Sequence, residues 1–596
     1  MNKAVILHSV DDAMHCVKHG LYKDSLLFST SSSVDTYLMY NHNLKSKCLS
    51  SFLSEEQVVT EMNTACEEVD NIIKNIDKLY SPKINKQYGF VGISFISGLY
   101  SFSVRYYYTA YKLILCAIDS IIKRHNISCI SIYQMDLSRG PLLYIKTNIE
   151  DIIHFIDNKL SVEVIHNGTR PEQNTAFELL NKCLRRPDKV LVKLKEYLKL
   201  LRGFSLRSGR ETVLMYESLY DMNFLRDNFK DFNIIYYTAH SSYPLLSRRK
   251  RFNVSSKINL KFDCNNQSFQ DLAKVLIKED FERNAERYIN SVKYLDAIHR
   301  KYNIKLAITG NSAQYGIKAV IFEYLKSMGV KTIVAQHGCN YGLQDAFGFH
   351  KHSDYSRCDY FISYGFTGAD LQKLYVDKLQ PIRCKILPYG SAKIKMSGKT
   401  RPKRKKTIDI LFPITMSLSM YAHAMTRLKP DLLTDIQLNL LNYLDTKKHH
   451  SIVVKPFENY NYDNCSVMTT LHELSNVKII DNLSFTEVMK KYDVKSVLIE
   501  YISTSLGEAI PYDCDIFVLG NSMDYFDHDA SSLMKKRVHY TEDVEEMKEL
   551  IDSCLEGRLA PKRDREFMER YLVKKNTESN IIDLIASIIK GKEISP

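Results

Sequence analysis

A histidine and a glycine follow directly after a short apolar run, in the sequence TIVAQHGCNYG at 332–342. An imidazole is the side chain best suited to proton transfer near neutral pH. Because Gly338 has no side chain, the backbone can turn tightly after His337 and present the imidazole to a substrate. The pattern predicts a strand that ends at a candidate general base, His337. A histidine that binds a substrate without taking its proton fits the same pattern.

Hydroxyl and lysine side chains follow three other apolar runs, in ILFPITMSLS, SIVVKP and VLIEYISTS. Hydroxyls, a lysine and the free N–H groups of a helix start can all bind a phosphate. The candidate phosphate-binding residues are Thr415, Ser417, Ser419, Lys455, Ser503, Thr504 and Ser505. Glu508 lies one turn further, where a carboxylate can accept hydrogen bonds from ribose hydroxyls. Ordinary turns, surface lysines and helix N-caps use the same residue types.

Polar residues also end predicted strands in the first half of the chain. They are His8, Asp136, Glu217 and Asn311. In α/β proteins the carboxyl ends of parallel strands meet on the ligand-binding side. Together with Gly338, these residues are therefore candidates for the acceptor side of a site, although each one alone is more often structural.

Several kinds of site have no signature in the sequence. No Walker A motif and no GxGxxG turn occurs, which argues against an ATPase and a standard dinucleotide enzyme. HKHSD at 350–354 offers two histidines and an aspartate, but no second ligand cluster accompanies it. We expect no metal site. The thirteen cysteines are scattered singly, as is typical of reduced thiols in a cytosol.

Short apolar runs alternate with longer helix-like segments through nearly the whole chain. Residues 305–336 predict a strand–helix–strand unit, with a helix at 313–328 that Gly329 closes. A second series of strands begins after the basic stretch 397–406. Two such series predict an α/β fold of two Rossmann-like domains with parallel sheets.

Length and composition describe a globular protein of more than one domain. The chain has 596 residues, of which 45% are hydrophobic and 25% charged. Its formal charge of +13 includes two dense basic runs, at 247–251 and 399–406. No nucleic-acid motif accompanies them, so we expect no nucleic-acid partner. An anionic membrane face, an anionic glycolipid and a plain solvated loop remain open.

The most apolar region of the chain runs from residue 89 to residue 122. Arg105, Lys112 and a tyrosine cluster interrupt it, which favours a buried or surface-lying helix over a membrane-spanning one. The N-terminus has the pattern of a first strand and not of a signal peptide. These features predict a cytoplasmic protein.

The order of QHGCNYG, ILFPIT, VVKPFE and STSLGEA, within roughly residues 305–520, resembles GT-B glycosyltransferases of bacterial capsule and O-antigen biosynthesis. The resemblance implies two Rossmann-like domains that face each other across a cleft. Members of that family often have His-Pro after the lysine-bearing strand, whereas this chain has Lys455-Pro456-Phe457. The implied division is an acceptor domain at 1–396, a basic linker at 397–407, a nucleotide-sugar domain at 408–540 and C-terminal helices at 541–596.

The resemblance also implies a chemistry. It is that of an inverting, metal-independent transferase that uses a nucleotide-sugar donor and no other cofactor. The Ser/Thr cluster is similar to that of Kdo and sialic-acid transferases, which use CMP-linked acidic sugars. The implied acceptor is a glycan or a lipid-linked glycan. From the basic runs we expect a cytoplasmic protein, with peripheral contact to the inner face of the cytoplasmic membrane as one option. His337 would take the acceptor proton opposite the phosphate-binding residues.

Two other classes of function fit the same architecture. One comprises CDP-polyol phosphotransferases and nucleotide-sugar epimerases. The other is a non-catalytic carbohydrate-binding or assembly protein. A phosphotransferase adds phosphorus to its acceptor, an epimerase needs no acceptor, and a binding protein hydrolyses no donor.

Overall fold

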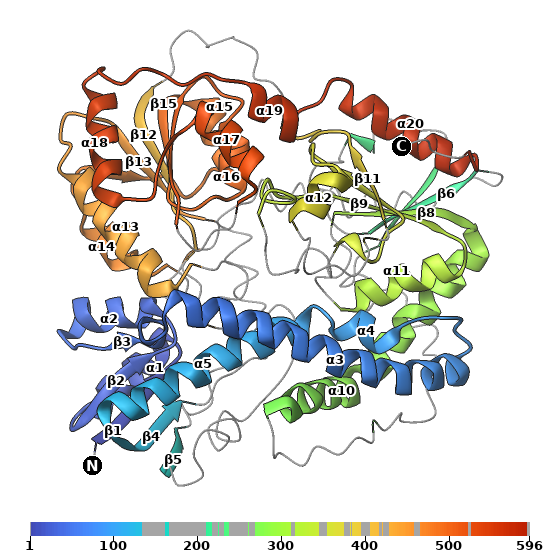
Figure 1. The fold of residues 1–596 in the computed structure, drawn as a ribbon, viewed down its shortest axis with the longest axis horizontal. Helices are drawn as coiled ribbons and strands as arrows, with labels where there is room; N and C mark the ends of the chain where they lie inside the picture. Colours follow the sequence, from blue (N-terminus) through green and yellow to red (C-terminus); the bar gives the residue numbers. More distant parts are fainter. Residues whose placement is uncertain are drawn as a thin grey trace.

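The computed structural model describes most of the chain as three layered α/β units (Figure 1). In every sheet of the described residues, neighbouring strands are parallel. The predicted α/β fold with parallel sheets is therefore confirmed. The described residues are 2–133, 161–165, 210–216, 224–225, 232–237, 260, 269–310, 316–344, 354–374, 382, 384–394, 406–416, 420, 428–457, 460, 465–521 and 526–592.

The first unit contains a five-stranded sheet in the order β3-β2-β1-β4-β5. Its strands are β1 (Asn2–Leu7), β2 (Ser25–Ser29), β3 (Lys47–Cys48), β4 (Ile127–Tyr133) and β5 (Ser161–Ile165). Its helices are α1 (Val10–Lys18), α2 (Ser32–His42), the 3-10 helix η1 (Leu49–Phe52), α3 (Glu55–Tyr88), α4 (Phe95–Tyr100) and α5 (Ser103–His125). The strand order changes direction between β1 and β4, which is where ligands bind in open sheets of this kind.

The apolar region at 89–122 forms α4 and most of α5, and both helices are buried in the protein. Arg105 of α5 is 3% exposed and pairs with Asp70 of α3, so the charge that interrupts the region is satisfied internally. No helix in the described part of the chain combines the length and apolarity needed to cross a membrane. The core around α3 and α5 also includes Val320 and Phe322 of the second unit.

The second unit contains a six-stranded sheet in the order β11-β10-β9-β8-β6-β7. Its strands are β6 (Thr212–Tyr216), β7 (Asn233–Tyr237), β8 (Ile304–Thr309), β9 (Lys331–Ala335), β10 (Tyr360–Ser363) and β11 (Lys385–Pro388). Its helices are α10 (Phe269–Tyr302), α11 (Ile317–Ser327) and α12 (Gly368–Leu374). The strand–helix–strand unit predicted at 305–336 is present as β8, α11 and β9. Gly329 follows α11 with a φ of 78°, the left-handed conformation expected of a closing glycine.

The third unit contains a six-stranded sheet in the order β14-β13-β12-β15-β16-β17. Its strands are β12 (Thr407–Pro413), β13 (Ile452–Lys455), β14 (Val477–Ile479), β15 (Asp493–Ile499), β16 (Asp515–Leu519) and β17 (His539–Thr541). Its helices are α13 (Pro430–Asp445), α14 (Met468–Glu473), α15 (Phe485–Lys491), α16 (Thr504–Ala509), α17 (His528–Arg537) and α18 (Val544–Leu555). The strand order reverses between β12 and β15, the switch point of a Rossmann sheet.

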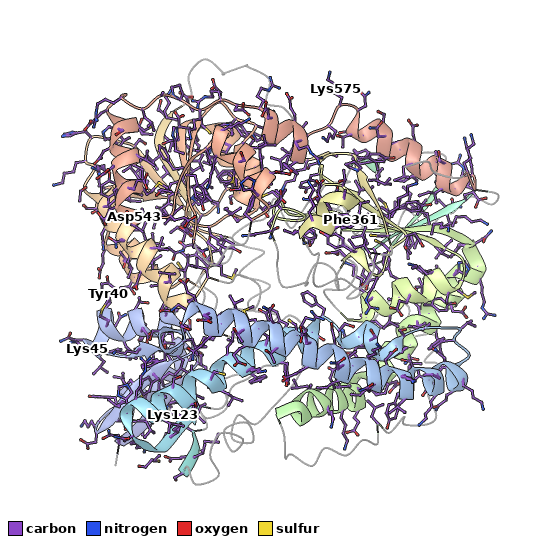
Figure 2. The ribbon with its side chains drawn as sticks, in the orientation of Figure 1. Tyr40, Lys45, Lys123, Phe361, Asp543 and Lys575 are labelled. Atoms are coloured by element: carbon purple, nitrogen blue, oxygen red, sulfur yellow. The ribbon has the colours of Figure 1, made fainter. Side chains whose placement is uncertain are left out.

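The last two helices, α19 (Glu566–Tyr571) and α20 (Thr577–Ile589), return from the third unit to the second (Figure 1). Ile585 and Leu584 of α20 pack into the same core as Ile308 of β8. Arg570 of α19 donates a hydrogen bond of 2.7 Å to the carbonyl oxygen of Gly365, which follows β10. Figure 2 labels Phe361 of β10, which lies in the core that the second and third units share.

The first and third units also touch directly. The hydroxyls of Ser32 and Thr434 lie 2.6 Å apart, and Thr36 donates to the carbonyl of Ser466 at 2.6 Å. The main-chain N–H of Met420 donates to the carbonyl of Thr30 at 2.8 Å. The three units therefore surround one central region of the molecule (Figure 1).

The range 1–396, which the sequence assigned to one Rossmann-like domain, holds two separate sheets, and the range 408–540 holds the third. Apolar runs identify strands, but they do not state which strands pair, so the sequence did not separate the first two sheets. The boundaries of the predicted domains stay predictions.

Candidate functional site

The turn after β9 carries His337 and is held rigidly on both sides. Gln336 is 2% exposed; its amide nitrogen donates to the carbonyl of Gly338 at 2.6 Å, and its amide oxygen accepts from the N–H of Tyr364 at 2.7 Å. These bonds tie the turn that carries His337 to its own backbone and to the segment after β10. The imidazole itself is half-buried.

The imidazole of His337 has a defined tautomer. Its Nδ1 lies 2.8 Å from the carbonyl oxygen of Gly310, which follows β8. A carbonyl can only accept, so Nδ1 carries the hydrogen, and in the neutral ring Nε2 carries the lone pair. This is the arrangement that a general base requires.

A buried tyrosine and aspartate lie behind the imidazole. The hydroxyl of Tyr341 is 3.0 Å from Nε2 and 3.2 Å from Nδ1 of His337. An atom nearly equidistant from the two nitrogens lies beside the ring, away from the axis of the Nε2 lone pair. The same hydroxyl hydrogen-bonds Asp354, which is 0% exposed; burial and then that carboxylate raise the pKa of Tyr341 well above its usual value. Tyr341 therefore stays a neutral phenol.

The start of α16 lies directly against the His337 turn. The thiol of Cys339 donates to the carbonyl of Ser503 at 2.7 Å. A side chain on Gly338 would begin 3.4 Å from the Thr504 hydroxyl, and one on Gly507 only 2.6 Å from Cβ of Cys339. The glycine at 507 thus allows the second and third units to meet, whereas Gly338 is in ordinary contact distance of α16.

The hydroxyls of this cluster are available to a ligand. Ser503 is the N-cap of α16, but its side chain caps no backbone N–H; Thr504 is exposed and Ser505 half-buried. The helix has six residues. Because a helix dipole sums over aligned peptides, α16 contributes a weaker field than a long helix, and the hydroxyls carry more of any anion contact.

Thr415 and Lys455 end neighbouring strands of the third sheet. The N–H of Ile414 donates to the carbonyl of Lys455 at 3.1 Å, which joins the two strand ends. Lys455 is 5% exposed, and its ammonium donates to the carbonyl of Pro456. A lysine so buried must keep such partners, since an unsolvated charge is costly.

A glutamate that the sequence did not single out lies between these elements. Glu500 follows β15 and is 2% exposed. Its Oε1 accepts from the main-chain N–H of Thr415 and from the amide of Gln437, the latter at 2.8 Å. Burial raises the pKa of Glu500 to about 7, against smaller lowering effects of Thr415 and Gln437. An acidic residue directly after the apolar run VLI was the available signal, as Lys455 was after VV.

Other candidates lie elsewhere. Glu508 pairs with Lys393 and accepts from the Thr486 hydroxyl at 3.2 Å, so its carboxylate already has partners. His8 belongs to the first sheet, where its Nδ1 lies 3.1 Å from the hydroxyl of Thr30. The candidates that fall outside the described residues are Asp136, Glu217, Asn311, Ser417 and Ser419.

A metal site is not visible in the part of the chain that the structure describes, where no three histidine, cysteine or acidic side chains cluster. Of the HKHSD segment, only Asp354 is described, and it bonds Tyr341 as above. The described cysteines are all free thiols.

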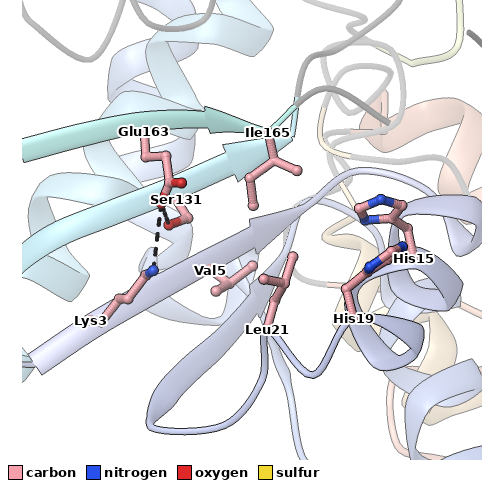
Figure 3. Close-up of a pocket in the computed structure, with 8 residues that line it drawn as sticks. All are labelled: Lys3, Val5, His15, His19, Leu21, Ser131, Glu163 and Ile165. Carbon is pink, nitrogen blue, oxygen red and sulfur yellow. Dashed lines mark hydrogen bonds and ion pairs between the residues drawn. The ribbon is translucent and has the colours of Figure 1, made fainter. Parts of the chain in front are cut away.

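The first sheet has a separate hollow of about 280 Å³ on one face, beside α1 (Figure 3). Ser131 and Lys3 both bond the carboxylate of Glu163 there, at 2.8 Å and 3.5 Å. His15 and His19 line its far side (Figure 3), with ring centroids 4.3 Å apart. No candidate residue of the His337 turn or of α16 lines this hollow.

Comparison with protein families matches residues 178–521, more than half of the chain, to the LIC12162 family transferases. The chain belongs to that family. The match spans β6 to β16, and so includes the His337 turn, Glu500 and α16. The predicted activity of a transferase is confirmed at this level. A comparison with curated protein sequences finds no match.

Solved structures with similar chains include MnaA of S. aureus with UDP, at 10% identity over 65% of this chain and 100% of that one, with a TM-score of 0.40. The wall teichoic acid polymerase TagF follows at 13% identity, 70% and 98% coverage and a TM-score of 0.34. Arabidopsis thaliana UGT89C1 shares 12% identity, 66% and 95% coverage and a TM-score of 0.35. Because these TM-scores lie below 0.5, we draw no conclusion from them.

Proposed function

We propose that this protein is an inverting, metal-independent glycosyltransferase that moves a sugar from a nucleotide donor to a glycan or glycolipid acceptor. One observation carries the proposal: the His337 turn of the second sheet lies against Ser503 and Thr504 of the third. A base and a set of phosphate-binding hydroxyls on facing sheets are what sugar transfer requires.

In the proposed reaction, Nε2 of His337 takes the proton of an acceptor hydroxyl. The acceptor oxygen attacks the anomeric carbon, the bond from that carbon to the nucleotide phosphate breaks, and the phosphate keeps the electron pair. Attack from the face opposite the leaving group inverts the anomeric configuration. The bond from Nδ1 to Gly310 keeps the imidazole in the required tautomer and stabilises it once Nε2 is protonated.

The third unit supplies the donor side of the proposal. Hydroxyls of Ser503, Thr504 and Ser505 contact the leaving phosphate, and Thr415 faces the same switch point from β12. These groups develop hydrogen bonds as charge grows on the phosphate, which lowers the barrier without a metal ion. Turnover should therefore be unchanged by a chelator.

A CMP-linked acidic sugar is the donor we propose, from the Ser/Thr cluster at 503–505. A surface-polysaccharide or lipid-linked glycan is the proposed acceptor, bound on the side of residues 1–396. We place the enzyme in the cytoplasm, at the inner face of the membrane, where the basic runs at 247–251 and 399–406 would meet anionic lipid.

A thermal-shift screen against CMP, CDP, UDP, GDP and their sugars tests the donor. A ligand that binds only the folded protein stabilises it by about 2.7 kcal/mol at roughly 100 times its Kd. A selective shift with CMP supports the proposal, and no shift with any nucleotide contradicts it. Product analysis then separates the reactions, since transfer of phosphorus to the acceptor identifies a phosphopolyol transferase instead.

A further inference from the structure

Glu500 closes a ring of hydrogen bonds around the backbone N–H and C=O of one residue, Thr415, just after β12. Its Oε1 accepts from the N–H of Thr415 and from the amide nitrogen of Gln437. That same amide nitrogen donates to the carbonyl of Thr415 at 2.9 Å. The main-chain donor and acceptor of Thr415 are thus both fixed by two buried side chains, one from β15 and one from α13.

The position of this ring is specific. β12 and β15 are paired neighbours in the centre of the third sheet, and the strand order reverses between them. Ligands of open α/β sheets bind beyond the carboxyl ends of the strands at such a reversal. Thr415 follows β12 and Glu500 follows β15, so the ring lies at that point.

The ring is incomplete in a way that points to function. Glu500 is 2% exposed and Gln437 is 0% exposed. Among the described residues, Oε2 of Glu500 and the amide oxygen of Gln437 have no hydrogen-bond partner. Each buried unsatisfied oxygen costs free energy, and an apolar pair at this strand end would avoid that cost.

The surroundings of Glu500 are uncharged. From β12 it faces Thr415, from α13 Gln437, and from the segment before α14 Cys465, whose pKa burial raises to about 12. No cationic side chain is among the described groups that act on the carboxyl. When Glu500 gains or loses its proton, the net charge at this strand end therefore changes, and none of these groups carries a positive charge to offset it.

We propose that Glu500 is a positioning residue for the donor nucleotide, which acts by holding the backbone N–H of Thr415 and, through Gln437, its carbonyl in place at the switch point of the third sheet. The inference rests on the proposed function, because it takes the third sheet to be the nucleotide-binding half. Glu500 does not contact the nucleotide itself. An anionic nucleotide beside this corner binds better when the carboxyl is protonated, so its affinity falls as pH rises through the titration of Glu500.

Isothermal titration of the full-length protein with CMP, CDP and UDP tests the inference. At about pH 6, where the wild-type carboxyl is largely protonated, Glu500→Ala removes the acceptor for both donors and should raise the Kd of the nucleotide that binds by about tenfold, as expected when the hydrogen bonds that fix Thr415 are lost. Glu500→Gln keeps one acceptor oxygen and cannot ionise. From about pH 6 to about pH 8, the wild-type Kd should rise roughly three- to tenfold relative to that of Glu500→Gln.

Asp409→Asn is the matched control. Asp409 lies near the start of β12 and accepts from the N–H of Ser451 at 2.8 Å. This bond is at the amino ends of the strands, whereas Glu500 lies at the carboxyl ends. Its Kd and pH profile should equal those of the wild type. Taking the ratio of Kd values at each pH also cancels the titration of the nucleotide phosphate.

The outcomes separate the two proposals. Binding by the wild type with an unchanged Kd in Glu500→Ala and the same pH profile in Glu500→Gln overturns the role of Glu500 and leaves the donor site standing. No binding of any nucleotide by the wild type overturns both. If Glu500→Ala does not fold, the pH profile of Glu500→Gln decides alone, since that variant keeps the shape of the side chain.

Discussion

His337 follows β9 of the second sheet and Glu500 follows β15 of the third, and the surroundings of these two titratable residues are opposite. His337 is half-buried, with Nδ1 bonded to the Gly310 carbonyl and Nε2 3.0 Å from the hydroxyl of Tyr341. Glu500 is fully buried, with one oxygen bonded twice and the other not at all.

The contrast shows two ways in which the structure can hold a titratable residue that follows a strand. A residue that must reach a ligand keeps one polar atom accessible and has the other fixed by a neutral backbone group. A residue that must shape the backbone turns inward and loses solvent, and its pKa rises. In our proposal the second sheet supplies proton transfer and the third sheet positions the nucleotide, and the variants below test that division.

Gly507→Ala should have the largest effect, because it pushes the third sheet away from the second. The added Cβ would lie 2.6 Å from Cβ of Cys339, so α16 and the His337 turn must move apart. We expect a loss of about 2–3 kcal/mol of unfolding free energy and a turnover reduced by roughly tenfold or more, because the reacting groups no longer align. Urea unfolding and an assay of donor turnover measure both.

Gly368→Ala is the control for that prediction, since an added Cβ at the start of α12 meets no atom within 4 Å. It should leave turnover and stability near wild type. Equal effects of the two substitutions would show that the contact between α16 and Cys339 has no special role.

Glu500→Gln tests whether Glu500 is a buried titrating carboxyl, through the pH dependence of the free energy of unfolding. The pKa of Glu500 in the folded protein, about 7, lies above that of an exposed glutamic acid. A raised pKa means that the folded state binds the proton more tightly, so this stabilisation is full at low pH and is lost as pH rises through about 7. Relative to Glu500→Gln, the wild type should lose roughly 2–3 kcal/mol from about pH 5 to about pH 8. Urea unfolding at a series of pH values measures it, and a constant difference between the two proteins is incompatible with a buried titrating carboxyl.

Tyr341→Phe tests the support behind His337. It leaves the buried Asp354 without the tyrosine hydroxyl, at a cost of about 1–2 kcal/mol. Turnover should fall less than about tenfold, since the Gly310 carbonyl still fixes the tautomer. Tyr443→Phe, which removes a 2.8 Å bond to the carbonyl of Lys548, should lower stability without changing turnover. A loss of turnover as large as that of a histidine variant would make Tyr341 a direct participant.

Thr504→Val should have the smallest effect. Thr504 is exposed, so its loss changes stability little. The Kd of the nucleotide should rise about three- to tenfold if the hydroxyl binds the phosphate, the range of one hydrogen bond. Thr446→Val, at the end of α13, is the matched control. Unchanged affinity in Thr504→Val would remove this hydroxyl from the site.

The sequence predicted the parts of the fold that local patterns control. The helix α11, the glycine at 329 that follows it and the apolar run at 332–336 were readable because each depends on residues close in the chain. The separation of residues 1–396 into two sheets was not readable, since it depends on which strands pair across long distances. Strand pairing leaves little local signal when most strands of a parallel sheet are buried on both faces.

The candidate site was predictable to a similar degree. The rule that polar residues at strand ends mark a ligand side selected His337, Thr415 and Ser503. It did not predict that Lys393 and Thr486 bind the carboxylate of Glu508. Nor did it predict that Gln437, from a helix distant in the chain, donates a hydrogen bond to Glu500. Those contacts join residues far apart in the chain, and only the packed structure brings them together.

The most direct test of the account measures two quantities on one protein, His337→Ala. We predict that turnover falls by about 10²–10⁴-fold, the range that a general base supplies. The Kd of the donor nucleotide should change less than about threefold, a change in binding free energy of about RT. Proton transfer would then belong to the second sheet and nucleotide binding to the third. Near-normal turnover, or a nucleotide affinity that is lost together with turnover, would contradict the central claim.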